Sequence, residues 1–388
     1  MAHEQYNFDE LIERRGTGCV KWDEAAAADI IPLWVADMDF RVAPPIQEAL
    51  QRRLDHGVFG YTHVGDEYYD AVCSWFARRH QWTTIDRRHI LYTTGVVPAI
   101  SCVLKALTMP GENVVLMTPV YNCFFSSVRN SGCLVLENRL LAPQPGGDGR
   151  YHIDWDDLEQ KLSEAKSTVL LLCNPHNPVG RLWTRQELQR VGDLCQQYGV
   201  TLVSDEIHCE LTMPGQVFVP MATVHAEAVV LNSPSKAFNT AGLQAANIIC
   251  SNPTLRRRID RAININEVCD LNPFGPVALV AAYNHSEAWL DALREYLWQN
   301  FLCLRQFLAK YLPALTVTPL EATYLAWVCI RPLGLDADTL CQRLLDHAHV
   351  QVSSGTIYGD ADYIRINLAC PRQRLLEGLR RMADELSK

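Results

Sequence analysis

Six short runs of consecutive apolar residues alternate with amphipathic stretches between residues 89 and 250, and this alternation restricts the possible folds more than any other feature. Each run is four to six residues long, is rich in Val, Ile and Leu, and is bounded by Gly, Pro, Asn or Asp. Continuous rather than alternating apolarity is typical of strands buried on both faces, as in a parallel sheet covered by helices. We expect strands at 89–93, 113–118, 168–173, 200–204, 228–231 and 246–250.

The stretches between these runs have the pattern of helices, and residues 184–198 are the clearest case. Thr184 and Glu187 form a capping box at the start of this stretch, and Gly199 supplies its end. Strands that alternate with helices predict the α/β class, with a mostly parallel open sheet in a large domain.

The pattern changes after about residue 285. Residues 286–312 are expected to form one long amphipathic helix, capped by Ser286 and stopped by Pro313. Shorter elements follow at 315–318, 324–330, 337–347, 350–352 and 364–368, and a last helix begins after Pro371. We therefore expect a large domain at 46–285, and a smaller α+β domain formed by 286–388 together with an irregular N-terminal arm, 1–45.

Composition excludes several classes of protein. The 388 residues are 48% hydrophobic and carry a net charge of −9, so neither disorder nor binding to nucleic acid or an anionic membrane is expected. The first residues lack the apolar core of a signal peptide, and no run approaches the ~18 apolar residues of a membrane span, which predicts a cytoplasmic protein. The 14 cysteines are scattered without a C-x-x-C pair, so we expect reduced thiols and no metal site.

Chemically useful groups follow the predicted strands, and ligands of open α/β sheets bind beyond the carboxyl ends of the strands. Gly95 follows the first run and begins an amphipathic stretch, which leaves the backbone N–H groups of Val96 and Val97 free to bind a phosphate. Tyr121 follows the second run, and Asn177 lies after the third, in a turn with two Asn-Pro steps. Each signal alone also has a structural explanation, as a turn or as core packing.

The next two strand ends carry opposite charges. Asp205 follows the fourth run, where it either caps a helix or faces a cationic group of a ligand, because a buried unpaired carboxylate is costly. Lys236 follows the fifth run, close to Ser233 and Ser235. Pyridoxal 5'-phosphate (PLP) needs an amine, an acid at its ring nitrogen, a donor to its phenolate oxygen, a stacking ring and a phosphate cup. The five strand ends together meet these needs.

Seven segments extend this interpretation into a resemblance. The segments 174–180 (NPHNPVG), 204–208 (SDEIH) and 233–239 (SPSKAFN) resemble fold type I PLP enzymes of the aminotransferase class I/II family, and the resemblance covers nearly the whole chain. The segments 21–23 (KWD), 34–40 (WVADMDF), 56–62 (HGVFGYT) and 272–275 (NPFG) resemble more narrowly its cystathionine β-lyase or C–S lyase branch, of the MalY/PatB type.

The resemblance implies a role for each candidate residue. Lys236 forms the imine with the cofactor, Asp205 pairs with the pyridinium nitrogen, and Tyr121 stacks on the ring; these are the expected catalytic residues. Asn177 donates to the phenolate oxygen. Arg365, an arginine inside an apolar strand, binds the substrate carboxylate through its planar fork.

The expected phosphate contacts come from two subunits. The resemblance implies that the amides of Val96 and Val97 and the hydroxyls of Ser233 and Ser235 hold the phosphate. Tyr61 is expected to reach the phosphate of the neighbouring subunit, which implies a homodimer with shared active sites.

Two positions depart from the family pattern. Gln244 stands eight residues after Lys236, where many members have an arginine, so the phosphate charge is expected to be balanced by backbone and hydroxyl donors. Residues 353–355 (SSG) replace a common Pro-Gly step on the substrate side. His208 is either a further group of the pocket or a structural histidine of a turn.

The expected function is α,β-elimination from cystathionine, cysteine or a cysteine S-conjugate, which gives a thiol, pyruvate and ammonia. An aminotransferase would use the same residues up to the loss of the Cα proton, and only the branch segments favour the lyase. Ser233-x-x-Lys236 also matches the nucleophile motif of serine β-lactamases, but its S-D-N and K-T-G partners are missing. A non-catalytic regulatory role through protein–protein contact is a remote alternative.

Overall fold

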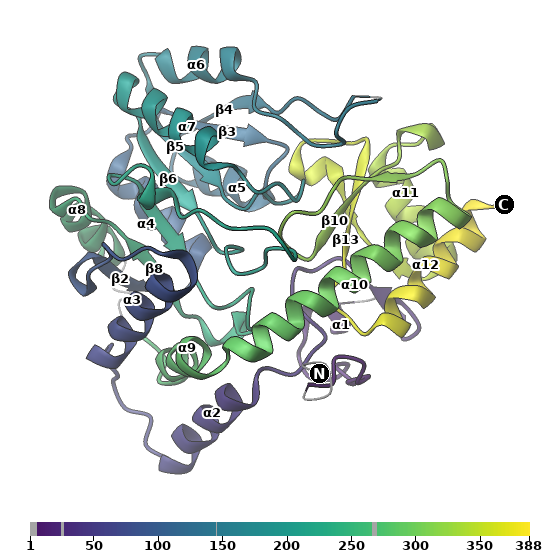
Figure 1. Cartoon of the computed structure of the whole chain (residues 1–388), viewed down its shortest axis with the longest axis horizontal. Coiled ribbons are helices and arrows are strands. Elements are labelled where there is room, and N and C mark those ends of the chain that lie inside the picture. The colour runs from purple at the N-terminus through teal and green to yellow at the C-terminus, as the bar shows by residue number, and fades with distance from the viewer. Residues whose placement is uncertain (1–5, 25–26, 145, 266–269) are drawn as a thin grey trace.

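The computed structural model describes residues 6–24, 27–144, 146–265 and 270–388. Part of the predicted arm, residues 1–5 and 25–26, thus lies outside the described residues. A large sheet covered by helices fills one side of the molecule, and a smaller sheet with its own helices fills the other (Figure 1). The long helix α10 (Glu287–Tyr311) runs from beside α9 to the small-sheet side.

The large sheet has seven strands in the order β2-β8-β7-β6-β5-β3-β4. Its strands are β2 (Ile90–Thr93), β3 (Asn113–Thr118), β4 (Leu134–Arg139), β5 (Ser167–Cys173), β6 (Thr201–Asp205), β7 (Val229–Asn232) and β8 (Ala246–Ile249). Six of these are the predicted runs, shifted by at most one residue at either end, and the prediction of an α/β fold with a mostly parallel sheet is confirmed. Only β8 is antiparallel, to both of its neighbours.

Successive residues of each central strand enter two different cores, which explains the continuous apolar runs. Val115 and Met117 of β3 pack in the core under α6 and α7, whereas Val114 and Leu116 pack in the core under α4, α5 and α8. The helices around this sheet are α3 (Asp66–His80), α4 (Val96–Leu107), α5 (Asn122–Asn130), α6 (Trp155–Ser163), α7 (Arg185–Tyr198), α8 (Pro253–Asn264) and α9 (Phe274–His285).

The sequence predicted both ends of α7 and the residue that precedes α10. Both hydrogen bonds of the capping box between Thr184 and Glu187 are present at the start of α7, and Gly199 ends it in the left-handed conformation. Ser286 is the N-cap residue of α10, as predicted, but its side chain makes no capping hydrogen bond. Its hydroxyl donates instead to the carbonyl of Ala281, 3.0 Å away, because α9 ends immediately before α10 begins.

The small sheet has the order β12-β13-β10-β9 and is antiparallel. Its strands are β9 (Thr316–Val317), β10 (Leu325–Cys329), β12 (Ser353–Ser354) and β13 (Tyr363–Asn367). The helices α11 (Ala337–Arg343) and α12 (Arg372–Leu386) pack with it and with α10 in one apolar core. The helix expected at 337–347 is divided, since Leu344–Ala348 forms a π-helical turn.

The N-terminal arm is ordered around one buried carboxylate. It holds α1 (Val20–Asp23) and β1 (Ile31–Pro32), which pairs in parallel with β11 (Val350–Gln351), and is followed by α2 (Pro44–His56). Asp39 accepts hydrogen bonds from Arg14, at 2.7 Å, and from the Trp22 indole, at 2.9 Å. The ammonium of Lys21 and the guanidinium of Arg374 lie 3.2 Å from the same carboxylate. These contacts bind the segment 34–39 to both ends of the chain.

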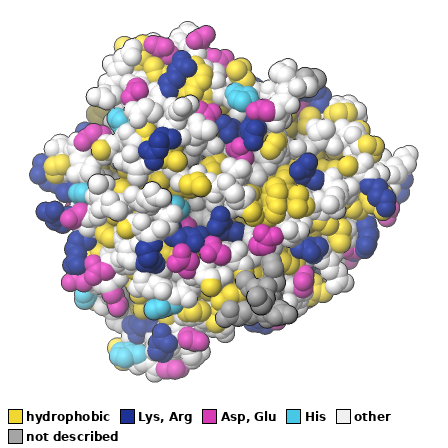
Figure 2. Space-filling view, in the orientation of Figure 1, with side chains coloured by type: hydrophobic (Ala, Val, Ile, Leu, Met, Phe, Trp, Pro, Cys, Tyr) yellow, Lys and Arg dark blue, Asp and Glu magenta, His cyan; other side chains and the backbone are white. Residues whose placement is uncertain are grey.

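Two surface properties agree with the composition. On the face shown in Figure 2, basic and acidic side chains are interspersed. Within the described residues, no helix has both the length and the apolarity required to cross a membrane.

Candidate active site

A cavity of about 390 Å³ lies where β5, β6 and β7 end. Cys173 and Asp205 are the last residues of β5 and β6, Ser233 follows β7, and all three line it. Nine of the ten predicted site residues line this one cavity: Val96, Val97, Tyr121, Asn177, Asp205, Ser233, Ser235, Lys236 and Arg365. Tyr61 does not, since it lies on the surface with its side chain 98% exposed.

Lys236 presents its amine inside the cavity. The Nζ atom donates to the carbonyl oxygen of Ala36, 2.7 Å away, and that oxygen also accepts from the hydroxyl of Tyr324 at 2.9 Å. Burial lowers the pKa of Lys236 to about 8, and the positive charge of Arg365 acts in the same direction. The amine can therefore lose its proton near neutral pH, as a nucleophile or a base requires.

Asp205 is buried and lacks a cationic partner among the described residues at ion-pair distance. Its Oδ1 accepts a hydrogen bond from the backbone N–H of Ile207, 3.1 Å away. Burial raises the pKa of Asp205 to about 7, against the weaker opposing effects of that hydrogen bond and of Lys236. A bound cation would favour the ionised carboxylate, so this position fits a ligand with a protonated nitrogen.

Arg365 lies in β13 of the small sheet and reaches Asn177, which follows β5 of the large sheet. Its Nη1 donates to Oδ1 of Asn177 at 3.2 Å, and its Nη2 donates to the carbonyl of Trp34 at 3.0 Å. Its buried Nε has no hydrogen-bond partner among the described residues. Its guanidinium also lies over the ring of Tyr358, 4.7 Å from the centroid. A carboxylate would give this guanidinium stronger, charge-assisted hydrogen bonds than these neutral acceptors do.

The N-terminus of α4 offers free backbone N–H groups to the cavity. Val96 and Val97 are the first residues of this twelve-residue helix, so their backbone N–H groups have no partner within it. The Ser233 hydroxyl donates to the carbonyl of Ala245 at 2.6 Å and accepts from the backbone N–H of Ser235 at 3.0 Å. Gln244, the position without the family arginine, also lines the cavity.

Two further rings line the cavity. Tyr121 is the N-cap residue of α5, and burial raises the pKa of its hydroxyl. His208 is buried, and its ring packs edge to face against Tyr324. Within the described ranges, its Nδ1 has no hydrogen-bond partner. Burial, with the positive charges of Lys236 and Arg365, holds the pKa of His208 well below its usual value, so the ring is neutral. Of the two interpretations of this residue, the structure favours a group of the pocket.

Glu206, next to Asp205, is a second buried carboxyl group. Its Oε1 accepts from the Ser204 hydroxyl at 2.9 Å and from the Met221 backbone N–H at 2.8 Å, whereas its Oε2 has no hydrogen-bond partner in the part of the chain that the structure describes. Burial raises the pKa of Glu206 to about 8. At neutral pH the folded chain therefore keeps a proton on Glu206 that the unfolded chain releases, and the free energy of unfolding falls as the pH rises from the usual carboxyl range toward 8.

We expect Glu206→Gln to be more stable than the wild type by at least ~2 kcal/mol at pH 8, because one pKa unit corresponds to ~1.4 kcal/mol. The amide keeps an oxygen for the two donors and has no proton to lose. Urea unfolding from pH 5 to pH 8 measures the difference, which should shrink toward acid pH. Glu48→Gln, at an exposed position, is the control and should show no such dependence. Equal pH profiles for wild type and Glu206→Gln would contradict the assignment.

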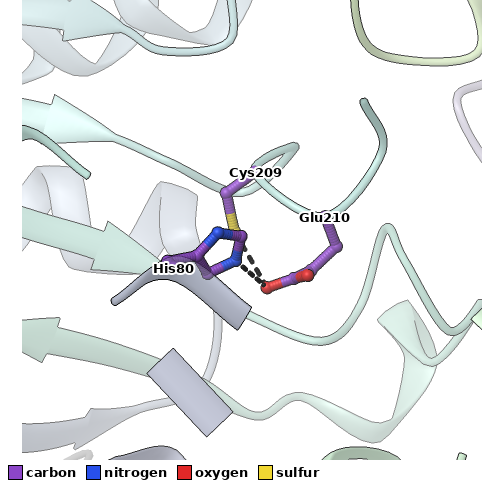
Figure 3. A group of neighbouring side chains, drawn as sticks. All are labelled: His80, Cys209 and Glu210. Carbon is purple, nitrogen blue, oxygen red and sulfur yellow. Dashed lines mark hydrogen bonds and ion pairs between the residues drawn. The ribbon is translucent and has the colours of Figure 1, made fainter. Parts of the chain in front are cut away.

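His80, Cys209 and Glu210 form a separate group of neighbouring side chains (Figure 3). Cys209 and Glu210 directly follow His208 in the chain, whereas His80 is the last residue of α3. The atoms of this group could ligate a metal, but the Glu210 carboxylate is already paired. Its Oε1 lies 2.6 Å from the Trp75 indole nitrogen and 2.7 Å from Nε2 of His80, and its Oε2 lies 3.8 Å from the Arg79 guanidinium. We interpret the cluster as an ion pair that joins α3 to the turn carrying His208.

Some of the residues that shape the cavity were not predicted. The carbonyls of Trp34 and Ala36 accept from Arg365 and Lys236, which places the arm in the wall of the site. The segment 34–40 did stand out in the sequence, but no pattern shows which main-chain oxygen will meet a side chain more than 190 residues away.

The site fits PLP in size and in chemistry. A buried carboxyl group without a cation, a buried amine of lowered pKa and a helix N-terminus with free N–H groups meet in one cavity. Asp205 would pair with the protonated ring nitrogen, and Lys236 would bind the aldehyde carbon. The backbone N–H groups of Val96 and Val97 would bind the phosphate.

Comparison with known proteins agrees with this fit. Residues 28–382 match the family model described as aminotransferase class I and II. The chain is 41% identical to cystathionine beta-lyase PatB of Bacillus subtilis, over 98% of this chain and 100% of PatB. PLP-containing cystalysin of Treponema denticola superposes with a TM-score of 0.94 at 34% identity, covering 98% and 99% of the two chains. The PLP-bound C-S lyase of Staphylococcus hominis gives a TM-score of 0.92 at 32% identity, covering 99% and 98%.

Proposed function

This chain belongs to the aminotransferase class I and II family, and we propose that it is a PLP-dependent carbon–sulfur β-lyase. Its reaction is α,β-elimination from cystathionine, cysteine or a cysteine S-conjugate, with a thiol, pyruvate and ammonia as products. The observation that carries the chemistry is the meeting of Lys236, Asp205 and Arg365 in one cavity. The full-length similarity to a cystathionine β-lyase favours elimination over transamination.

Each polar group has one task in this proposal. Bound PLP supplies an electron sink that stabilises negative charge at the substrate α-carbon. Asp205 keeps a proton on the ring nitrogen, Arg365 binds the substrate carboxylate, and Asn177 donates to the phenolate oxygen. The amine of Lys236 holds the cofactor before substrate binds and then takes the Cα proton as a general base. The ring of Tyr121 covers the cofactor ring.

The test is the appearance of pyruvate without a keto-acid acceptor. Purified protein is supplied with PLP and L-cystathionine, and pyruvate is followed by a coupled reduction. Pyruvate formed in equivalence with thiol supports the lyase. Amino-group transfer that requires an added keto acid would instead identify an aminotransferase. Borohydride treatment followed by peptide mass analysis should place the cofactor on Lys236.

We further propose the predicted division into a large PLP-binding domain at 46–285, and a small domain at 286–388 with the arm 1–45. The large sheet falls within the first range and the strands β9 to β13 within the second, in support of it. A cytoplasmic location is also proposed, because the thirteen cysteines among the described residues are all free, as in a reducing compartment.

The active unit that we propose is a homodimer in which Tyr61 completes the site of the other subunit. Three neighbouring side chains support this. Val58, Phe59 and Tyr61 are 63%, 50% and 98% exposed, and such a cluster of exposed apolar side chains is typical of an interface. With Gln244 in place of an arginine, one more hydroxyl donor to the phosphate has a large effect.

Tyr61→Phe is expected to raise the dissociation constant of PLP about ten- to a hundredfold, because a hydrogen bond to a charged group contributes ~1.5–3 kcal/mol. The dimer should persist, since the ring remains. Equilibrium dialysis measures PLP affinity, sedimentation measures the assembly, and Tyr311→Phe, another exposed tyrosine, is the control.

Subunit exchange shows whether Tyr61 acts in the other subunit. Mixing Tyr61→Phe with Lys236→Ala homodimers forms heterodimers with one site carrying both lesions and one carrying neither. At a PLP concentration that does not saturate Tyr61→Phe, activity should rise above the sum of the parents. A mixture no more active than its parents, with exchange verified, would place Tyr61 outside the partner's site.

A further inference from the structure

The carbonyl oxygen of Ala36 is shared by two side chains from different parts of the chain. The amine of Lys236 donates to it at 2.7 Å, and the hydroxyl of Tyr324, the residue before β10, donates to it at 2.9 Å. Ala36 and Lys236 line the cavity, whereas Tyr324 is fully buried behind its wall. A carbonyl oxygen has two lone pairs, so it can bind both donors at once. Either donor can therefore hold this oxygen when the other is absent.

The backbone on both sides of Ala36 is fixed by one side chain. The amide nitrogen of Asn367 donates to the carbonyl of Val35 at 2.5 Å and to the carbonyl of Asp37 at 2.7 Å. Because both neighbouring carbonyls are anchored, the Ala36 oxygen cannot turn away to find another donor. If it lost both of its donors, it would be an unpaired backbone acceptor in the wall of the site, which is costly.

Tyr324 is held in position by its neighbour Thr323. Thr323 is buried and has a φ of 75°, in the left-handed region that β-branched residues rarely adopt. Its backbone N–H donates to the carbonyl of Leu211 at 2.8 Å, and its hydroxyl accepts from the backbone N–H of Leu325 at 3.1 Å. Backbone strain of this kind concentrates at functional sites. The ring of Tyr324 also packs against His208, so its hydroxyl has a fixed direction.

The hydroxyl of Tyr324 is reserved for this one carbonyl. Among the described residues, it donates only to Ala36. Burial, with the negative charge of Asp37 nearby, raises the pKa of Tyr324 above its usual value, so the hydroxyl keeps its proton and remains a donor. Lys236 differs in this respect, because its amine has a second task away from the carbonyl.

We propose that Tyr324 is a positioning residue for Lys236. In the PLP-dependent function proposed above, on which this role rests, the amine leaves the Ala36 oxygen to hold the cofactor. The Tyr324 hydroxyl stays on that oxygen and keeps it hydrogen-bonded. The amine thus moves between the carbonyl and the cofactor without leaving an unpaired acceptor behind. Without the hydroxyl, holding the cofactor would remove the last hydrogen bond of the Ala36 oxygen.

A double-mutant cycle on PLP affinity tests this role. Tyr324→Phe is expected to raise the dissociation constant of PLP about five- to a hundredfold, because the bound state then has a carbonyl without a donor. In the Lys236→Ala background, the same change should alter the constant by about twofold at most, since the amine is missing both with and without PLP. Equilibrium dialysis of wild type, both single variants and the double variant measures the four constants. Phenylalanine keeps the ring packed against His208, so the fold is retained.

The share of bound PLP that is attached to the lysine gives a second readout, which a merely structural role would not change. At saturating PLP, a short borohydride pulse should fix a smaller share of the cofactor to Lys236 in Tyr324→Phe than in the wild type, because the amine then stays on Ala36. Tyr151→Phe is the matched control: Tyr151 is buried, does not line the cavity, and its hydroxyl accepts from the Trp327 indole at 3.2 Å. It should lower stability and leave PLP affinity and the fixed share unchanged.

The possible results separate this role from the proposed function. An unchanged PLP affinity in Tyr324→Phe, or an equal loss in the wild-type and Lys236→Ala backgrounds, would overturn the role of Tyr324 and leave the PLP-dependent function standing. A wild type that binds no PLP would remove that function, and this role with it. Dialysis needs no substrate, so neither result depends on whether elimination or transamination follows.

Discussion

Replacing Lys236 with alanine is expected to abolish elimination, with a loss of at least ~10⁴-fold in kcat/KM, because a general base alone contributes ~10²–10⁴ and this residue also holds the cofactor. The fold should remain intact. Among the described residues, the amine donates only to the carbonyl of Ala36, and that carbonyl keeps its second donor, the Tyr324 hydroxyl.

Pyruvate assays, circular dichroism and PLP dialysis together measure these effects. The variant should bind PLP without a covalent bond, so that borohydride no longer fixes the cofactor to the chain. Lys166→Ala, at an exposed lysine, is the matched control and should retain activity. Turnover near the wild-type level in Lys236→Ala would show that another group holds the cofactor and removes the proton.

Asp205→Asn is expected to lower kcat/KM by at least ~10²-fold while raising the stability of the cofactor-free chain. Activity falls because the amide cannot keep the ring nitrogen protonated. Stability rises because burial raises the pKa of Asp205 to about 7, so that near neutral pH the folded chain binds a proton that the unfolded chain has released. The wild type therefore loses stability between its usual carboxyl pKa and pH 7, and the variant does not.

Because activity is expected to fall while stability rises, the two measurements distinguish a catalytic role of Asp205 from a structural one. Steady-state assays give the activity, and urea unfolding of cofactor-free protein at pH 5 and pH 7.5 gives the stability. The asparagine Oδ1 can still accept from the Ile207 N–H, so a role in capping that turn is preserved. A large loss of stability with normal turnover would mean that Asp205 serves the turn and not the cofactor.

The sequence predicts the central strands well because burial on both faces gives an unmistakable pattern. β3 and β5 consist almost wholly of buried residues, and both were predicted within one residue. β4 was not predicted, because it is the edge strand beside β3 and its residues Glu137, Asn138 and Arg139 are polar. The antiparallel direction of β8 could not be predicted from its residues, because its four residues are all buried, like those of β7, which is parallel to β6.

The sequence predicted the site residues that follow neighbouring parallel strands. Asn177, Asp205 and Lys236 come from consecutive strand ends of one sheet, and such ends share one edge. Arg365 was placed by resemblance, because it belongs to the other sheet. The main-chain oxygens of Trp34 and Ala36 could not be predicted, since their positions depend on how the arm packs between the two sheets.

The position of residues 34–39 has a consequence for synthesis on the ribosome. The partners of this segment come much later in the chain: Asn239 bonds to Met38, Asn367 to Val35, and Arg374 to Asp39 across 335 residues. Residues 34–39 must therefore wait for these partners until Arg374 has left the exit tunnel. A nascent chain that stops before residue 365 contains all seven strands of the large sheet but lacks Arg365, one of the charged residues that line the cavity.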